Sequence, residues 1–179
     1  MRPPGNLHLG QKRLLVSGEI QSRPNEPIAI RVRPFVLADR AFVLGLAPRL
    51  VIGIPPWRDP GKMLETATGW LEHSIAQHGD ETMLFVAEDG DGSPLGFASV
   101  SHSTHFTGVS QAEIGELAVA EAREGHGVGR ALVAACAGWA RGRGYRFLTL
   151  GTGAANERAR RFYRRLGFLE EDVRLAKPL

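Results

Sequence analysis

Residues 112–132, AEIGELAVAEAREGHGVGRAL, combine an apolar strand pattern, a glycine-rich turn and the start of an amphipathic helix. The first N–H groups of a helix have no partner within the helix, and the helix dipole places about half a positive charge at that end. Glycines at positions 125, 127 and 129 let the backbone approach a ligand without a Cβ in the way. The segment therefore predicts a cradle for a phosphate or pyrophosphate at the helix start.

The turn alone does not decide which phosphate ligand it takes. The Walker signature does not match, because no Gly-Lys-Ser/Thr follows the glycines. A dinucleotide fingerprint fits poorly, since the next strand pattern, residues 146–150, is not followed by an acid that would bind ribose. A tight turn without any ligand is the alternative interpretation.

Strand and helix patterns alternate along the rest of the chain. Ile28, Ile30 and Val32 alternate with other residues as in a half-buried strand, and residues 89–92, DGDG, are typical of a hairpin turn. The patterns predict strands at 28–33, 82–88, 95–102, 112–119, 146–150 and in the tail 168–179, and helices at 39–50, 62–78, 128–142 and up to Arg165, where Gly167 follows as a left-handed cap. We therefore expect an α/β (α+β) domain in the order β-α-α-β-β-β-α-β-α-β, with a mixed, mostly antiparallel central sheet flanked by helices.

Length and composition favour one globular domain. The chain has 179 residues, of which 43% are hydrophobic and 23% charged, and its net charge of +3 is too small a surplus to indicate nucleic-acid binding. The single cysteine, Cys136, cannot form an internal disulfide, and no apolar run reaches the ~18 residues that cross a bilayer. We expect a cytoplasmic protein without membrane or nucleic-acid partners. Its domain would span 28–179, after an N-terminal extension at 1–27 that is either partly ordered on the domain surface or the product of a mis-assigned start codon.

Two motifs, in this order and on these elements, resemble the GNAT superfamily of acetyl-CoA-dependent N-acetyltransferases. The first is LAV followed by the turn that ends Gly-Val-Gly-Arg at 127–130, and the second is Asn156 with RFYRRLGF at 161–168. The resemblance covers about residues 28–179 and implies acetyl-CoA as the cofactor. It implies a cofactor site made of Leu117, Ala118, Val119, Arg123, Glu124, Gly125, His126, Gly127, Val128, Gly129, Arg130, Asn156 and Tyr163.

The same resemblance implies that an amine attacks the thioester directly, without an acyl-enzyme. Glu113 occupies the place of a general base in some family members, and Glu116, nearer the thioester, is the alternative; on a regular strand the two would point to opposite faces. Tyr163 matches the tyrosine that hydrogen-bonds the leaving thiol and can protonate it. Cys136 lies on the apolar stripe of a helix, which favours a buried, inert thiol.

One position departs from the family pattern. The pattern begins with Gln or Arg, and this chain has Glu124 there, with Arg123 one place earlier. Backbone amides make most of the phosphate contacts, and Arg123 and Arg130 can supply positive charge beside them. The departure therefore concerns the affinity for the cofactor and not its class.

The sequence leaves the acceptor open. The loop at 51–61 carries Trp57 and Arg58, which we expect near the substrate, and the histidines lack the spacing and supporting acids of a metal site. A small-molecule primary amine is the first hypothesis. The alternatives are a protein lysine or N-terminus, and a non-catalytic acyl-CoA-binding regulatory module. A homodimer, common in the family, is compatible with the sequence.

Overall fold

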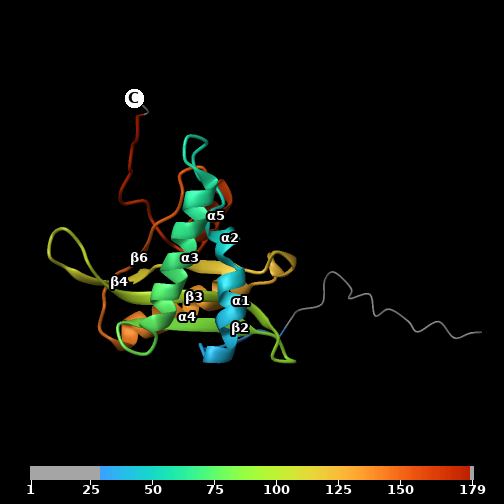
Figure 1. Cartoon of the computed structure of the whole chain (residues 1–179). Coiled ribbons are helices and arrows are strands. Elements are labelled where there is room, and N and C mark those ends of the chain that lie inside the picture. Colours follow the sequence, from blue (N-terminus) through green and yellow to red (C-terminus); the bar gives the residue numbers. More distant parts are fainter. Residues whose placement is uncertain (1–28, 178–179) are drawn as a thin grey trace, which may run out of the picture.

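A six-stranded sheet with helices on both faces forms the centre of the computed structural model, which describes residues 29–177 (Figure 1). The strands run in the order β1-β2-β3-β4-β6. β5 pairs with residues 96–98 of β3, next to the stretch 101–104 that pairs with β4. Only the β4–β6 pair is parallel. The strands are β1 (Arg31–Pro34), β2 (Thr82–Glu88), β3 (Pro94–Thr104), β4 (Ser110–Ile114), β5 (Leu117–Val119) and β6 (Leu148–Leu150). The helices are α1 (Arg40–Gly45), α2 (Ala47–Leu50), α3 (Pro60–Ala76), α4 (Val128–Gly142) and α5 (Glu157–Arg165), with short 3-10 turns at Leu37–Asp39 and Glu121–Arg123.

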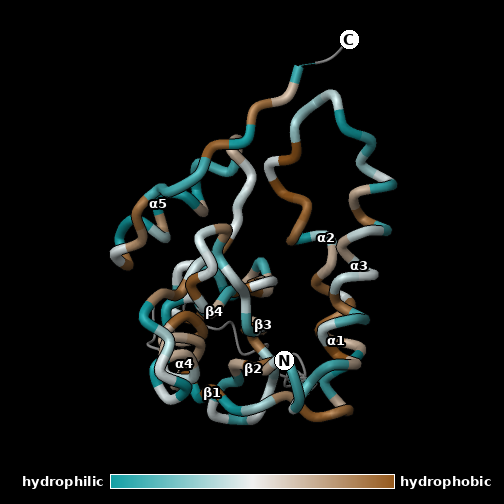
Figure 2. Tube along the Cα trace, turned by 90° about the vertical axis from the view of Figure 1, so that its left-hand side faces the viewer, coloured by the Kyte–Doolittle hydropathy of each residue, from teal (hydrophilic) through white to brown (hydrophobic). Residues whose placement is uncertain are grey.

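Two apolar clusters hold the helices to the sheet. α1, α2 and α3 cover one face and α4 covers the other, as Figure 2 shows. On the first face Val43 and Leu71 pack against Phe97 of β3, and on the second Leu132 and Cys136 belong to a cluster that Tyr163 of α5 also contacts. The mixed, mostly antiparallel sheet flanked by helices is confirmed. Within residues 29–177, no helix has the length and hydropathy that a bilayer span requires.

An extra residue separates β4 from β5, where the sequence predicted one continuous strand. Ser101 of β3 faces Glu113, and Ala98 faces Leu117, so two residues of β3 oppose the three residues at 114–116. Such a bulge reverses the alternation of side chains. Glu113 and Glu116 therefore point to the same face, towards α3, and the expectation that they lie on opposite faces is wrong.

β4 and β6 run together for three residue pairs and then part. Ala112, Glu113 and Ile114 pair with Leu148, Thr149 and Leu150, whereas β5 pairs with β3 alone. Among residues 29–177, no strand covers the outer edge of β5.

Two further predictions are corrected in detail. The helix expected at 39–50 is interrupted at Leu46, because Pro48 cannot donate the N–H that would continue it. The tail at 168–177 forms no strand. Glu170 accepts hydrogen bonds from Arg160 (2.8 Å) and Arg164 (2.5 Å), which tie the start of the tail to α5. The left-handed cap is confirmed, since Gly167 has φ 90°. The N-terminal extension at 1–27 lies outside the described residues.

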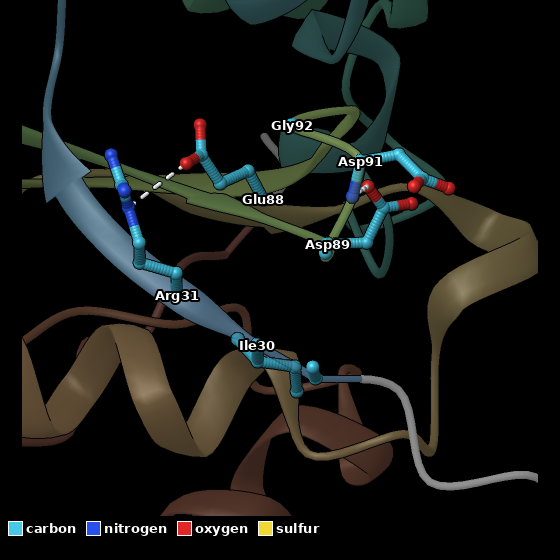
Figure 3. Close-up of a pocket in the computed structure, with 8 residues that line it drawn as sticks. Ile30, Arg31, Glu88, Asp89, Asp91 and Gly92 are labelled. Atoms are coloured by element: carbon cyan, nitrogen blue, oxygen red, sulfur yellow. Dashed lines mark hydrogen bonds and ion pairs between the residues drawn. The ribbon is translucent and has the colours of Figure 1, made fainter.

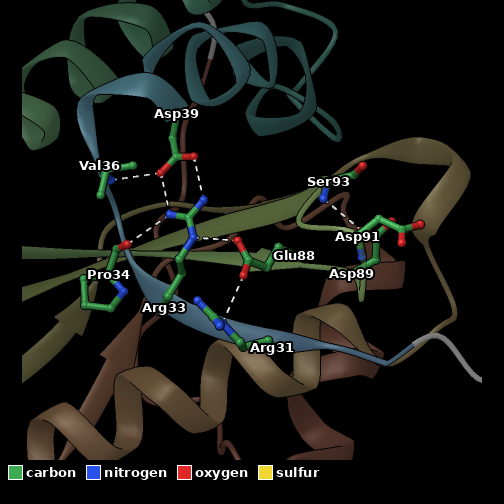
Figure 4. A network of polar contacts seen from close by, with 9 residues as sticks. All are labelled: Arg31, Arg33, Pro34, Val36, Asp39, Glu88, Asp89, Asp91 and Ser93. Carbon is green, nitrogen blue, oxygen red and sulfur yellow. Dashed lines mark hydrogen bonds and ion pairs between the residues drawn. The ribbon is translucent and has the colours of Figure 1, made fainter.

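A network of ion pairs joins the edge strand β1 to the start of the helical layer (Figure 4). Arg33 donates to both carboxylate oxygens of Asp39 (2.7 and 2.9 Å) and to Glu88 (2.6 Å), which also pairs with Arg31 (3.0 Å). Asp39 is buried and accepts a further hydrogen bond from the N–H of Val36 (2.9 Å). The hydrogen bonds from Arg33 lower the pKa of Asp39 below its ordinary value.

We expect Asp39→Asn to destabilise the fold by about 2 kcal/mol, because the variant leaves Arg33 half-paired at a partly buried site. The folded-state pKa of Asp39 is lowered, so its contribution is fully present above the unfolded-state value near 3.9 and disappears as the pH falls below it. Urea denaturation at neutral and acidic pH measures both effects. Glu72→Gln, which breaks the exposed pair with Arg40 (3.3 Å), is the control and should change stability by less than about 0.5 kcal/mol. Equal losses in the two variants would contradict the assignment.

Candidate functional site

A cleft of about 400 Å³ lies between β5, the turn before α4 and the helix α5. Residues of both sequence motifs meet there, although Leu117 and Tyr163 are 46 positions apart in the chain. The structure brings together all the residues expected to hold a cofactor except His126, whose ring donates from Nδ1 to the C=O of Glu124 (2.9 Å). The lining residues are Arg49, Ile52, Leu117, Ala118, Val119, Arg123, Glu124, Gly125, Gly127, Val128, Gly129, Arg130, Asn156, Arg158, Ala159, Phe162, Tyr163, Arg165 and Leu166.

The start of α4 supplies unpaired N–H groups to this cleft. The first hydrogen bond of the helix runs from the N–H of Ala131 to the C=O of Gly127 (3.1 Å). The N–H groups of Val128, Gly129 and Arg130 donate to no acceptor among residues 29–177. Gly127, the N-cap, has φ 90°, a left-handed conformation that L side chains rarely adopt. The turn therefore has the form of an anion cradle, which fits the diphosphate of a coenzyme A thioester.

The free edge of β5 contributes a second set of backbone groups. The C=O of Glu116 and the N–H of Ala120 both bond to β3 (2.9 Å each). Backbone groups alternate in direction along an antiparallel strand, so Leu117 and Val119 direct theirs away from β3. Both residues line the cleft, where their N–H groups can meet a carbonyl of a bound ligand.

Positive charge is concentrated in the cleft, with a single carboxylate among the lining residues. Five arginines line it, namely Arg49, Arg123, Arg130, Arg158 and Arg165, against Glu124 alone. Sequence reasoning identified Arg123 and Arg130 and missed the other three. Arg158 and Arg165 lie within the motif that runs from Asn156 to Phe168 and could have been found from it, whereas nothing in the sequence around Arg49 indicates a ligand.

Glu124 does not point freely at the cleft. One carboxylate oxygen pairs with Arg49 of α2 and the other with Arg158 of α5. Glu121 lies 3.7 Å from Arg49 and is itself exposed. The carboxylate that departs from the family pattern thus links α2 and α5, which both contribute residues to the cleft lining.

The side chain of Asn156 makes a second connection, between the start of α5 and the turn after α2. Its side-chain oxygen accepts from the N–H of Ala159 (3.1 Å), which caps α5, and its amide donates to the C=O of Ile52 (3.3 Å). A Cβ on Gly53 would lie 2.8 Å from the Cβ of Asn156, and one on Gly153 would lie 2.9 Å from the C=O oxygen of Gly53. Glycine at both positions permits this close junction between residues 52–53 and 153–156.

Tyr163 lies on the cleft wall, packed edge-on between Phe162 and Phe168, at 5.0 and 5.5 Å between ring centroids. Burial raises its pKa to about 12, so the phenol keeps its proton at neutral pH. Cys136, whose pKa burial also raises to about 12, is enclosed in the core. The expectation of a buried thiol at Cys136 is confirmed.

The two candidate bases occupy different environments on the α3 face. Glu116 is buried at the bulge, and its carboxylate accepts hydrogen bonds from Ser74 of α3 (3.0 Å) and from Ser99 of β3. Burial raises its pKa, against the opposing effect of these hydroxyl groups. Glu113 is half-buried on β4, opposite Ser101. Neither carboxylate lines the cleft.

The residues expected at the acceptor site lie apart from the cleft lining. Trp57 and Arg58 belong to the loop between α2 and α3, and Trp57 is 55% exposed. Of the three acids at 170–172, Glu170 pairs with Arg160 and Arg164, and a carboxylate oxygen of Glu171 lies 3.7 Å from Nε2 of His105.

A second hollow, of about 390 Å³, lies beside β1 and the turn between β2 and β3 (Figure 3). Two of its three acids already have partners. Glu88 pairs with two arginines, and Asp89 accepts from the N–H groups of Asp91 (3.1 Å) and Ser93 (2.9 Å). Across residues 29–177, no group of three or more His, Cys, Asp or Glu side chains is placed to hold a metal ion. We assign Glu88 and Asp89 to the fold.

Comparison with known proteins agrees with this geometry. The family model described as Acetyltransferase (GNAT) family matches residues 52–168, which include the glycine turn, β5 and α5. The chain belongs to the GNAT family. An uncharacterised N-acetyltransferase from Methanocaldococcus jannaschii is 36% identical over 96 residues, which cover 52% of this chain and 42% of that protein. The GNAT chain thus matches less than half the length of this curated relative.

Solved GNAT structures share the fold at low identity. A putative acetyl transferase from Pyrococcus furiosus superposes with a TM-score of 0.68 at 20% identity, over 84% of this chain and 99% of that one. The aminoglycoside N-acetyltransferase AAC(6')-Iy, solved in complex with CoA, gives 0.62 at 21% identity, over 86% and 97%. A ribosomal-protein-alanine N-acetyltransferase from Brucella melitensis gives 0.61 at 18% identity, over 84% and 100%. The fold class and the family are confirmed, while the roles of individual site residues stay predictions.

Proposed function

We propose that this GNAT chain is an N-acetyltransferase that moves the acetyl group of acetyl-CoA to a primary amine of a small molecule. The observation that carries the proposal is the meeting, in one cleft, of the unpaired N–H groups of α4 with the free edge of β5. The first suits a diphosphate and the second suits the amide-rich arm and the acyl carbonyl of the same cofactor. Bound acetyl-CoA would supply an acetyl group activated as a thioester.

Residues of the chain would then take a proton from the ammonium group of the acceptor and give a proton to the leaving sulfur. An alkyl ammonium has a pKa near 10.4, so its deprotonation at pH 7 costs about 4.6 kcal/mol, which a positioned carboxylate offsets. Glu113 or Glu116 would take that proton, directly or through water. The amine nitrogen forms the new bond to the acetyl carbon as the carbon–sulfur bond breaks, and Tyr163, protonated at neutral pH, would give its proton to the leaving sulfur.

The junction between residues 52–53 and 153–156 supports a small acceptor. Ile52 and Asn156 both line the cleft and are hydrogen-bonded to each other, so the cleft is bridged at that point. A bridged opening admits a small amine more readily than a segment of a folded protein. Trp57 and Arg58, on the loop that leaves this junction, are the side chains we propose to contact the acceptor.

The direct experiment measures release of CoA thiol by the purified chain with acetyl-CoA and a panel of amines, including small amines, aminoglycosides and lysine or N-terminal peptides. We expect turnover with a small amine and none with Gly127→Glu, which puts a bulky negative charge where φ is 90° and the anion should sit. Gly138→Glu, on the open side of the same helix, is the control and should stay active. Turnover with peptides alone would favour a protein acetyltransferase, and CoA binding without any turnover would favour a regulatory module.

We expect Tyr163→Phe to lower kcat by at least about tenfold, since a general acid contributes this much or more, and to leave the dissociation constant of CoA nearly unchanged. Tyr145→Phe is the matched control. Tyr145 is the other tyrosine of the chain, bonds to His102 (3.1 Å) and does not line the cleft. An unchanged kcat in Tyr163→Phe would assign that ring to packing.

The pH dependence of kcat/KM separates the two glutamates. A base works only when deprotonated, so the rate should fall as the pH drops through its pKa, and burial places that of Glu116 above the ordinary value. If Glu116 is the base, the acidic limb lies above the ordinary glutamate pKa of about 4.3, disappears in Glu116→Gln and persists in Glu113→Gln. The reverse pattern identifies Glu113. Wild-type profiles in both variants would exclude both residues.

A further inference from the structure

Glu124 occupies an unusual electrostatic position. It is the one carboxylate among the lining residues of the cleft, where five arginines gather, and its side chain is only 23% exposed. The N–H groups of Val128, Gly129 and Arg130 open into the same cleft. A fixed negative charge there opposes any anionic ligand unless something else holds the carboxylate.

Two arginines from different elements hold it. Arg49 comes from the last turn of α2 and contacts one carboxylate oxygen, while Arg158 comes from the first turn of α5 and contacts the other. Without Glu124 the two guanidinium groups would repel each other. The carboxylate therefore holds both arginine side chains beside the anion cradle and links α2 to α5.

We propose that Glu124 is a built-in competitor for the phosphates of the cofactor, which take over Arg49 and Arg158 from Glu124 when acetyl-CoA binds. The inference rests on the proposed function, because it takes acetyl-CoA as the ligand of the cleft. It goes further by giving the departure from the family pattern a role. The glutamate lowers the affinity for the cofactor and for its product CoA.

This competition has a signature in the salt dependence of binding. When phosphates replace Glu124 at the two arginines, ion pairs break as others form, so the number of ion pairs changes little. When no carboxylate has to be displaced, every phosphate–arginine pair is a gain, and added salt screens that gain. Removal of the charge at position 124 should therefore strengthen CoA binding and make it more sensitive to salt.

The test is isothermal titration of the full chain with CoA, which is chemically inert here, between about 50 and about 300 mM NaCl. We expect Glu124→Gln to bind CoA roughly fivefold more tightly than wild type at the lowest salt, as expected for one partly exposed charge interaction, and to lose this advantage as salt rises. Glu121→Gln is the matched control. It removes the same charge three residues away, from a side chain that is 84% exposed, 3.7 Å from Arg49 and outside the cleft lining, and should leave CoA affinity nearly unchanged.

Two further measurements distinguish competition from a general change in the cleft. The KM for S-acetylpantetheine, which lacks phosphates, should be the same in wild type and Glu124→Gln. Arg158→Met, at a side chain that is 66% exposed, should weaken CoA binding in the wild-type background and by a larger factor in the Glu124→Gln background. The single variant gives a result even if Glu124→Gln fails to fold.

The outcomes separate this inference from the proposed function. CoA binding by wild type that is equal to or tighter than binding by a folded Glu124→Gln would overturn the competition and leave the acetyltransferase intact. An unchanged CoA affinity in Arg158→Met would do the same. A wild-type chain that gives no heat with CoA would overturn the cofactor assignment, and the competition with it.

Discussion

Between β4 and β5 the chain carries one residue more than the facing stretch of β3. This bulge determines which backbone groups of the sheet remain available to a ligand. β4 is held on both sides, by β3 and β6, whereas in the described part of the chain β5 pairs with β3 alone. The main-chain groups of Leu117 and Val119 are therefore available to a ligand instead of being used in a ladder. The same extra residue turns Glu116 towards α3. There the hydroxyl groups of Ser74 and Ser99 donate hydrogen bonds to its buried carboxylate.

The cleft is completed by elements that come from distant parts of the chain. α4 begins directly after the glycine turn and presents unpaired N–H groups, and α5 returns along the side of the cleft with Asn156 at its N-cap. α2 contributes Arg49, and the turn that follows it contributes Ile52. Backbone amides supply one set of polar groups in the cleft, and side chains such as Glu124 and Arg158 supply another.

Two of the ion-pair networks that join elements of this fold differ in burial and in position. The Arg33 network connects β1 with the start of α1 and encloses a buried carboxylate, so its role is to hold the edge of the domain. The Glu124 bridge is more exposed and sits where an anionic ligand would bind, so its ion pairs can be exchanged. Burial and position, and not the number of ion pairs, separate a structural network from one that can respond to a ligand.

The sequence determined those properties that depend on neighbouring residues along the chain. The glycine spacing at 125–129 set the turn, the apolar periodicity set the strand at 82–88 and the helix from Val128, and Asn156 and Gly167 set the two ends of α5. Together these local signals were sufficient for the fold class, the family and most of the cleft lining.

The tertiary structure decided what depends on register and on packing between distant elements. A one-residue bulge reversed the direction of Glu116, and no periodicity rule shows where such a residue is absorbed. The ion pairs of Glu124 with Arg49 and Arg158 join positions 75 and 34 residues away, and the tail, where the sequence predicted a strand, is instead hydrogen-bonded to α5 through Glu170. Hydrogen bonds and ion pairs of this kind act over a few ångströms in space, so they follow from how the helices pack on the sheet and not from the order of residues in the chain.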